Sequence, residues 1–212
     1  MEITIIGTGN MARAIGTRAI AGGHDVTIVG KDEASAQEVV SELAGASGDG
    51  GVSGAAQGDP VTGDVVVLAV YYSDARDAVE QRANELTGKI VIDITNPVNE
   101  SMDALVVPPD GSATDELAKL APEARFVKAF NTTFAGTLVD GEVAGQPLDV
   151  LIAGDDEDAK QVTAALARDG GLNPVEVGGQ ARARELEALG LLHMGAQAQL
   201  GTNFASAVKI VA

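Results

Sequence analysis

The sequence begins with a short apolar strand that runs directly into a glycine-rich turn. Residues 3–6 form this β-branched run, and Gly7-Thr8-Gly9-Asn10-Met11-Ala12 follows it with the G-x-G-x-x-A spacing typical of dinucleotide-binding turns. Gly7 is expected to permit the tight turn, and Gly9 to let the backbone approach a pyrophosphate. The helix predicted over residues 11–21 directs its free N–H groups and its positive dipole end toward the phosphates.

The surroundings of this turn favour nucleotide binding over a purely structural role. Glycine turns of this spacing also join strands to helices in proteins that bind nothing. Here the predicted helix is followed by Gly22-Gly23 and by a second predicted strand over Asp25–Val29. The three elements complete a βαβ unit of about 30 residues, which is the context that the motif requires.

The end of the second strand is where such folds select between NAD and NADP. An acidic residue there binds the ribose 2′-hydroxyl of NAD, whereas a basic residue accommodates the 2′-phosphate of NADP. Lys31 has the position of the basic residue. Asp32 and Glu33 follow it directly, and either of them could instead cap the helix predicted over Ala34–Leu43. We expect Lys31 to bind the 2′-phosphate, with a solvated surface lysine as the alternative.

Three further predicted strands end in small or polar residues. The apolar run over Asp64–Tyr71 ends in Ala69-Val70-Tyr71, the strand over Lys89–Ile94 precedes Asn96-Pro97, and the strand over Arg125–Phe130 precedes Asn131. Ligands of open α/β sheets bind outside the carboxyl ends of the strands. We therefore expect these three strand ends to converge on one crevice with the glycine turn.

The alternation of strands and helices predicts an α/β fold of the Rossmann type, with a doubly wound, mostly parallel sheet. We expect a nucleotide-binding domain over residues 1–178 and a helical C-terminal segment over residues 179–212. Residues 45–63 are rich in small residues and predict a loop or a short, irregular edge element. The remaining predicted helices span residues 73–86, 112–120 and 155–168, and the remaining predicted strands span residues 148–153 and 174–177.

Composition restricts the class of partner. The chain has 31 Asp and Glu residues against 14 Lys and Arg, which gives a formal net charge of −17. Nucleic acid and anionic membranes would be repelled. An acidic excess of this size is typical of a protein from a high-salt cytoplasm, and also of some ordinary acidic proteins. The chain has no cysteine and no apolar run of the roughly 18 residues that span a bilayer, so a cytoplasmic location is expected.

Acid–base and metal-binding motifs are missing from the sequence. There is no nucleophile elbow, Walker lysine or metal-spaced cluster, and a carbonyl reductase normally needs a general acid. Hydride transfer between two organic cofactors can instead rest on positioning. In the C-terminal segment an apolar stripe from Leu186 to Leu200 predicts a homodimer, and His193 on that stripe is expected to be packed and hydrogen-bonded, with a role in the site as the alternative.

Several segments together resemble one known family, the NADP oxidoreductases dependent on coenzyme F420. The resemblance covers nearly the whole chain, and its most particular segments are the Thr-Asn-Pro strand end and Lys-Ala-Phe-Asn-Thr. The segments that carry it are residues 1–10, 23–26, 65–70, 94–97, 127–132 and 184–187. It implies a Rossmann domain, a dimer formed through helices, and hydride transfer between NADPH and a deazaflavin ring stacked on the nicotinamide.

The resemblance also implies roles for individual residues. Thr8 to Met11 would hold the pyrophosphate, and Lys31 stands where the family places an arginine for the 2′-phosphate. Ala69 to Tyr71 and Asn96-Pro97 would flank the nicotinamide. Asn131, which replaces a histidine of the family pattern, would lie near the meeting point of the two rings. No residue is assigned as a catalytic acid or base, and no metal is expected.

These observations lead to one principal hypothesis and two alternatives. The principal one is an NADP(H)-dependent oxidoreductase that exchanges a hydride with coenzyme F420 or a similar flat redox acceptor. The first alternative is an NADPH-dependent reductase of a flavin, a quinone or a small carbonyl compound, in which Tyr71 or His193 supplies a proton. The second is a protein that senses NADP(H) without catalysis and reports to a protein partner.

Overall fold

Apolar runs alternate with helical segments along the chain, and they assemble into one sheet with helices on both faces. The computed structural model describes residues 1–46 and 48–211, so residue 47 of the predicted loop and residue 212 of the predicted C-terminal segment lie outside the described residues. The strands are β1 (Glu2–Ile6), β2 (Asp25–Gly30), β3 (Val52–Ala56), β4 (Val65–Leu68), β5 (Ile90–Asp93), β6 (Arg125–Lys128), β7 (Glu142–Val143), β8 (Gln146–Pro147), β9 (Asp149–Ala153) and β10 (Asn173–Gly178). The helices are α1 (Asn10–Ala21), α2 (Glu33–Leu43), α3 (Tyr72–Arg82), α4 (Ala113–Leu120), α5 (Ala135–Asp140), α6 (Glu157–Asp169) and α7 (Ala183–Leu200), the last preceded by the 3-10 turn η1 (Gln180–Arg182).

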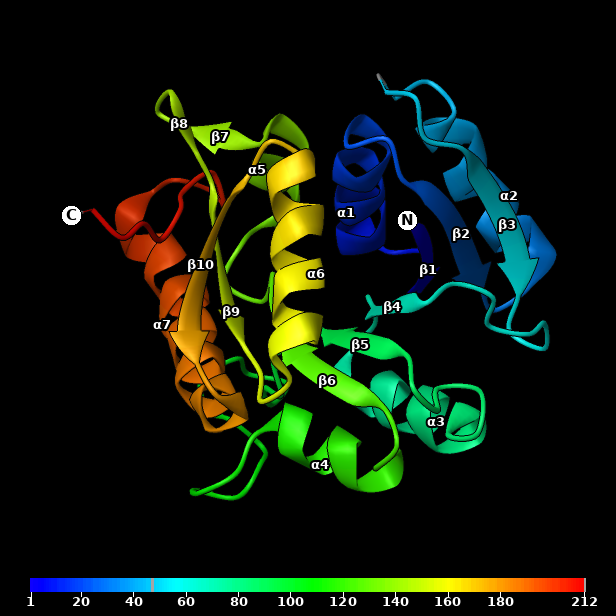
Figure 1. Ribbon diagram of the computed structural model, residues 1–212. Coiled ribbons are helices and arrows are strands. Elements are labelled where there is room, and N and C mark those ends of the chain that lie inside the picture. The colour runs from blue at the N-terminus through cyan, green and yellow to red at the C-terminus, as the bar shows by residue number, and fades with distance from the viewer. Residues whose placement is uncertain (47, 212) are drawn as a thin grey trace.

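The main sheet has the strand order β10-β9-β6-β5-β4-β1-β2-β3 (Figure 1). The six strands from β3 to β6 are parallel and follow the Rossmann order 3-2-1-4-5-6. β9 and β10 are parallel to each other, and β9 meets β6 in the antiparallel sense at the pair Lys128 and Ala153. The predicted Rossmann-type, mostly parallel sheet is therefore confirmed.

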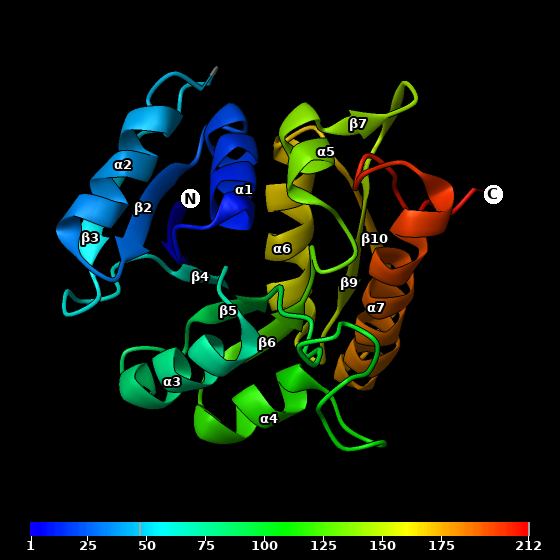
Figure 2. The ribbon, with the colours of Figure 1, turned by 180° about the vertical axis from the view of Figure 1, so that it is seen from behind.

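Each central strand is apolar on both faces because helices cover both sides of the sheet. In β4, Val65 and Val67 pack into the core that α1, α2, α5 and α6 cover, whereas Val66 and Leu68 pack into the core beneath α3 and α4. Figures 1 and 2 show α1 beside α6, and α3 beside α4. Full burial of such a side chain contributes about 1.5–3 kcal/mol relative to exposure. The continuous apolar runs in the sequence thus match the doubly covered sheet.

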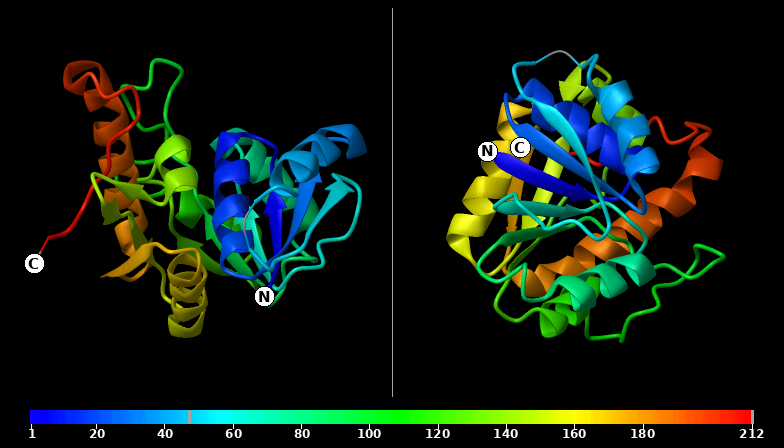
Figure 3. Two further views of the ribbon diagram at one scale, coloured as in Figure 1. Left: turned by 90° about the horizontal axis from the view of Figure 1, so that it is seen from above. Right: turned by 90° about the vertical axis from the view of Figure 1, so that its right-hand side faces the viewer.

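α7 extends this architecture at the far end of the sheet. Leu186 packs against Leu151 and Ala153 of β9, on the face opposite to the one that α6 covers. Figure 3 shows α7 at the opposite end of the molecule from α2. The side chains of β9 alternate between the two helices, so this antiparallel extension is doubly covered like the central strands.

The structure differs from the sequence-based expectations in its smaller elements. Residues 52–56 form a regular edge strand, β3, which pairs with β2 in parallel. The helix predicted to reach Leu86 ends at Arg82, whose buried side chain donates to the carbonyl groups of Gln57 and Asp59. The sequence also gave no indication of α5 or of the β7–β8 hairpin. Contacts distant in sequence accompany β3, α5 and the end of α3, whereas β7 and β8 pair through a local turn.

The C-terminal segment is helical only in part. α7 ends at Leu200 because Gly201 adopts a left-handed conformation with φ 64° and donates its N–H to the carbonyl of Gln197. Residues 202–211 then run back along the domain without helix, which corrects the expectation of a helical segment over residues 179–212. No helix in residues 1–46 and 48–211 is long and apolar enough to cross a membrane.

Candidate functional site: a cleft at the carboxyl edge of the sheet

The glycine turn joins β1 to α1 at the carboxyl edge of the sheet. Gly7 has φ 127°, donates to the carbonyl of Val29, and lies so close to β4 that a Cβ would stand 2.3 Å from the carbonyl oxygen of Ala69. Gly9 is the N-cap of α1, and a Cβ there would meet nothing within 4 Å. No side chain caps α1, so its first N–H groups are available to an anion. The two glycines therefore have different roles. Gly7 allows the turn to pack closely against the end of β4, whereas Gly9 leaves open space beside the start of α1.

A cleft of about 780 Å³ extends from this turn. It brings together the strand ends after β1, β4, β5 and β6, as expected for ligands of open α/β sheets. Segments from α5, α7 and the C-terminal residues complete its wall. The lining residues are Thr8, Gly9, Asn10, Met11, Ala69, Val70, Tyr71, Asp74, Ile94, Thr95, Asn96, Val98, Met102, Phe130, Asn131, Thr133, Phe134, Ala135, Gly136, Met194 and Phe204.

Most of the predicted site residues lie in this cleft, and three do not. Gly7 is packed behind the turn, Pro97 is not part of the lining, and Lys31 lies on the surface at the end of β2. Lys31 has no hydrogen bond or ion pair with other residues in the described part of the chain. Because it follows β2 and lies outside the lining, the expected contact is with the outer, adenosine end of a dinucleotide. The 2′-phosphate role of Lys31 remains a prediction.

The two acidic residues after Lys31 have different positions. Asp32 caps α2, since its Oδ1 accepts a hydrogen bond of 2.8 Å from the Ser35 amide. Glu33 lies in the first turn of that helix, where its charge is favourable to the dipole. The capping alternative is therefore confirmed for Asp32. This bond also holds the pKa of Asp32 below its usual value, so its carboxylate is ionised at neutral pH.

Strained backbone conformations gather around the cleft. Met102, Phe130 and Phe204 have positive φ values of 53°, 62° and 63°, and all three line it. For residues other than glycine this conformation costs about 1–2 kcal/mol each. Such strain persists where the surrounding structure imposes it, and it is often found at binding sites. The sequence shows no signal for it, because none of the three is a glycine or an asparagine.

A pair of asparagines links the ends of β5 and β6 inside the cleft. Asn131 donates to Asn96 Oδ1 at 2.9 Å and to the Leu186 carbonyl at 2.8 Å, and Asn96 donates to the Asn131 carbonyl at 2.8 Å. α7 approaches so closely that a Cβ on Gly190 would lie 2.6 Å from Asn96 Oδ1. Two buried oxygens, Asn131 Oδ1 and Thr95 Oγ1, have no hydrogen-bond partner among the described residues. They are available to a polar group of a ligand.

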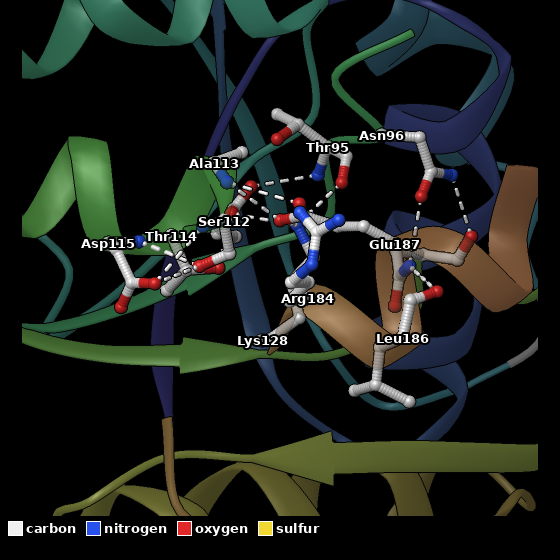
Figure 4. A network of polar contacts seen from close by, with 12 residues as sticks. Thr95, Asn96, Ser112, Ala113, Thr114, Asp115, Lys128, Arg184, Leu186 and Glu187 are labelled. Atoms are coloured by element: carbon white, nitrogen blue, oxygen red, sulfur yellow. Dashed lines mark hydrogen bonds and ion pairs between the residues drawn. The ribbon is translucent and has the colours of Figure 1, made fainter. Parts of the chain in front are cut away.

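A buried network of charges lies behind this pair (Figure 4). Lys128, fully buried, binds Asp93 Oδ2 at 2.9 Å, Glu187 Oε1 at 2.8 Å and the Thr95 carbonyl at 2.6 Å. Thr114 donates to Asp93, and the Ala113 amide donates to Glu187. Burial raises the pKa of Glu187 despite the nearby ammonium. The network joins β5, β6, α4 and α7, and thereby fixes the strand ends that carry Asn96 and Asn131.

Sequence reasoning missed this network, although a signal was present. Asp93 and Lys128 each follow two apolar residues at the end of a strand, and the register of β5 against β6 makes them neighbours. An acidic and a basic residue at matching ends of two buried strands indicate an ion pair, since buried charges are normally paired. Glu187 could not be assigned in this way, because its place depends on how α7 docks.

The two candidate proton donors lie in different surroundings. Tyr71 lines the cleft, but its side chain is 84% exposed. His193 is buried outside the lining, with its ring 4.3 Å from the Phe134 ring and its Nε2 2.9 Å from Ser206 Oγ. Burial lowers the pKa of His193, so it is neutral at pH 7. The structure thus matches the expectation of a packed, hydrogen-bonded histidine.

The C-terminal residues are tied down by Asp149. Its carboxylate accepts from Lys209 Nζ at 2.6 Å and from the Ile210 amide at 2.7 Å. This anchor follows Phe204, which lines the cleft. Burial alone would raise the pKa of Asp149, but hydrogen bonds from Asn173, Lys209 and Ile210 outweigh burial and lower it. The ionised carboxylate therefore anchors Lys209 and Ile210 near the end of the described chain, beyond the contacts that Ser206 makes with His193 and Gln197.

Asp149→Asn is expected to release the C-terminal residues while leaving the sheet intact. The amide cannot replace an acceptor that binds an ammonium and a backbone N–H together. Limited proteolysis should then remove residues after Phe204 at least about tenfold faster, as expected for local rather than global opening. Acid should act in the same way: stability from ionised Asp149 is present above pH of about 4 and is lost as the pH falls through the lowered pKa. Asp140→Asn, an exposed change on α5, is the control, and equal cleavage rates in the two variants would contradict this role.

Comparison with known proteins relates part of the chain to a family. Residues 2–97 match the model of the family described as NADP oxidoreductase coenzyme F420-dependent. This region of the chain is similar to that family. The matched region contains the glycine turn, Lys31 and Asn96, so the resemblance noted from the sequence is confirmed there. The structure is a Rossmann-type domain, and the family that it resembles is described as NADP-dependent.

Similarity to individual proteins extends beyond the matched region. The chain is 32% identical over 140 residues to the F420-dependent NADP reductase of Methanocaldococcus jannaschii, covering 63% of this chain and 61% of the relative. It is 29% identical over 190 residues to the metalloreductase STEAP3 of Rattus norvegicus, covering 90% of this chain and 36% of the relative. The chain therefore spans less than two thirds of either relative.

A crystal structure from Arthrobacter sp. FB24, described as a candidate F420-dependent NADP reductase, superposes over the whole molecule. Its TM-score is 0.86 at 28% identity, and the superposition covers 99% of each chain. The C-terminal helix, which the family match does not include, therefore has a counterpart in that structure.

Proposed function

We propose that this protein transfers a hydride between NADP(H) and coenzyme F420 or a similar flat redox acceptor. The observation that carries the proposal is the composition of one cleft, in which an uncapped helix N-terminus opens beside amide and apolar side chains. The similarity to the F420-dependent NADP reductase of Methanocaldococcus jannaschii supports the acceptor, and the family description supports the cofactor.

The residues present fit the cofactor. Gly9 leaves room for a pyrophosphate where a Cβ would intrude, and the first N–H groups of α1 would bind it. The free oxygens of Asn131 and Thr95 would orient a carboxamide. Lys31 would bind the 2′-phosphate from outside the cleft. When bound, NADPH supplies a hydride from its dihydronicotinamide ring.

We expect the protein to contribute to the reaction by positioning the nicotinamide and the acceptor ring. Reduction of a flat redox ring needs one proton in addition to the hydride, and water can supply it. The described cleft has no buried acid or base poised for proton transfer, because Tyr71 is exposed and His193 lies behind Phe134. A ring acceptor is therefore favoured over a carbonyl compound, whose reduction normally needs a general acid.

Absorbance measurements test the proposal directly. Purified protein, NADPH and F420 are mixed anaerobically, and the nicotinamide and deazaflavin bands are followed together across a range of salt concentrations. Parallel loss of both bands, dependent on the protein, is expected. If no turnover occurs at any salt concentration, the F420 assignment is wrong.

Lys31→Ala is expected to reduce the preference for NADPH over NADH by about tenfold, as is typical of losing one exposed phosphate contact. Steady-state kcat/KM values for the two cofactors give this ratio. Lys119→Ala, an exposed lysine on α4, controls for the change of net charge. An unchanged ratio in Lys31→Ala would place 2′-phosphate recognition elsewhere.

A homodimer remains a proposal. Within a single chain Leu186 and His193 of the apolar stripe are already buried, whereas Leu192 and Leu200 on α7 are 69% and 57% exposed. A second copy would cover these two leucines. Light scattering at high salt should give twice the chain mass, and a monomeric mass would contradict the proposal.

A further inference from the structure

Arg13 of α1 connects the glycine turn to α2. Its Nη1 donates to the carbonyl of Thr8. The same guanidinium pairs through Nε with Glu42 Oε2 at 2.6 Å and through Nη2 with Glu38 Oε1 at 3.3 Å. Thr8 lines the cleft, whereas Arg13 and the residues of α2 lie outside its lining. Arg13 thus holds a residue of the cleft from outside the cleft.

The contact with Arg13 orients the peptide between Thr8 and Gly9. In a trans peptide the carbonyl and the N–H point in opposite directions. Because the Thr8 carbonyl is directed at Arg13, the Gly9 N–H is directed away from that side chain. Neither the Thr8 nor the Gly9 N–H donates to another group within residues 1–46 and 48–211. The Gly9 N–H is therefore a free donor at the N-cap of α1.

Glycine at position 9 makes this orientation depend on Arg13. Glycine adopts positive and negative φ values about equally well, so the peptide that precedes it has two accessible orientations. Gly9 has φ −80° and open space at the position of a Cβ. Turning the peptide over would place the Thr8 oxygen where the Gly9 N–H now points, and a carbonyl oxygen repels a phosphate. Among the described residues, only Arg13 donates to the Thr8 carbonyl.

Resting on the proposed function, we propose that Arg13 is a positioning residue for the pyrophosphate of NADP(H). It holds the Thr8 carbonyl away from the phosphates, so that the Gly9 N–H faces them together with the first N–H groups of α1. Glu38 and Glu42 hold the guanidinium in place and neutralise its charge. Arg13 therefore acts through the turn and is not itself a phosphate ligand.

Arg13→Met removes the donor and the charge at a similar side-chain length. We expect NADPH to bind about tenfold more weakly, as is typical when a hydrogen bond to a charged group is lost. The KM for NADPH should rise by the same factor while kcat is unchanged, because the pyrophosphate is bound alike in the ground state and the transition state. The melting temperature of the free protein should change little, since exposed ion pairs contribute little to stability.

Adenosine 2′-phosphate separates the orientation of the turn from the loss of a positive charge. This ligand carries the 2′-phosphate of the cofactor but has no pyrophosphate. Its affinity, measured by displacement of NADPH from the protein, should be the same in Arg13→Met as in the wild type. Equal weakening of NADPH and adenosine 2′-phosphate would assign the effect to charge and overturn the positioning role.

Two glutamates of α2 give a matched pair of variants. Glu42→Ala removes a negative charge but also loosens Arg13, so NADPH is expected to bind about threefold more weakly, the order expected for an exposed ion pair. Glu33→Ala removes the same charge from the exposed surface of the same helix, where Glu33 makes no ion pair with Arg13. It should not weaken NADPH binding. If Glu42→Ala instead strengthens binding as much as Glu33→Ala does, charge decides the affinity and the inference is wrong.

The outcomes distinguish this inference from the proposed function. If Arg13→Met binds NADPH as tightly as the wild type, the positioning role is wrong while the cofactor site stands. If the wild type binds NADPH but reduces no ring acceptor, including F420, the hydride transfer is wrong, and weaker binding by Arg13→Met still supports the positioning role. If the wild type does not bind NADPH, the proposed function and this inference are both wrong.

Discussion

Lys128→Met is expected to lower the free energy of unfolding by about 3–5 kcal/mol, the usual cost of removing one partner from a buried ion pair. Methionine has a similar length, so little volume is lost, but Asp93 and Glu187 would then share a buried site without a counter-charge. Burial already raises the pKa of Glu187, so this carboxyl group would take up a proton once the ammonium is removed. Urea denaturation at neutral pH measures the loss, which should be smaller at acidic pH, where Glu187 is neutral.

The control for this variant is a lysine in an exposed ion pair with a glutamate. Lys119 binds Glu116 at 2.7 Å on the surface of α4, and its side chain is 69% exposed. Lys119→Met is expected to leave the denaturation midpoint nearly unchanged, since water and salt screen exposed pairs. If Lys128→Met were no more destabilising than Lys119→Met, the buried network would not hold β5, β6 and α7 together.

Gly9→Ala is expected to weaken NADPH binding by about tenfold or more while leaving the free protein as stable as before, because the added methyl group would occupy the space of a pyrophosphate at a helix N-terminus. Gly9 has φ −80°, which any residue adopts, and the new Cβ would contact no protein atom within 4 Å. Thermal unfolding with and without NADPH measures both properties. The melting temperature of the free variant should be unchanged, and its increase on adding NADPH should be smaller than in the wild type.

Gly7→Ala tests the packing role of the same turn, whereas Gly9→Ala tests its role in binding the cofactor. Its Cβ would stand 2.3 Å from the Ala69 carbonyl oxygen, at a φ of 127° that L residues rarely adopt. This variant should be destabilised in the absence of any ligand. An equal NADPH response in Gly9→Ala and wild type would show that the pyrophosphate does not approach Gly9.

The sequence predicted the parts of the fold that depend on local pattern. Continuous apolar runs mark β4 and β5, and the glycine spacing marks the transition from β1 to α1. Since the carboxyl ends of parallel strands share one edge, the residues after Ile6, Leu68 and Asp93 could be assigned to one cleft. β3 was expected only as a short, irregular edge element or a loop, and α5 was not predicted at all, because a five-residue edge strand and a six-residue helix depend on tertiary packing.

The lining residues that come from α7 and from the chain after it were harder to predict than those at the strand ends. Met194 and Phe204 line it because α7 docks against β9 and because the residues after Gly201 turn back along the domain. That turn is held by the Gln197 side chain, which contacts Thr202, Phe204 and Ser206, and the residues beyond it are anchored by Asp149; no spacing in the sequence reveals either set of contacts. The positive φ of Phe130, immediately before Asn131, is likewise a property of the folded state.

The most direct test of the central claim is a titration of the protein with NADPH and, separately, NADH in concentrated salt, followed by nicotinamide fluorescence. The proposed cleft, with α1 presented to a pyrophosphate and Lys31 at the outer end, predicts saturable binding that is clearly tighter for NADPH. Equal or tighter binding of NADH would contradict the role of Lys31. Failure of both cofactors to bind would mean that the glycine turn is purely structural here, and the proposed function would be wrong.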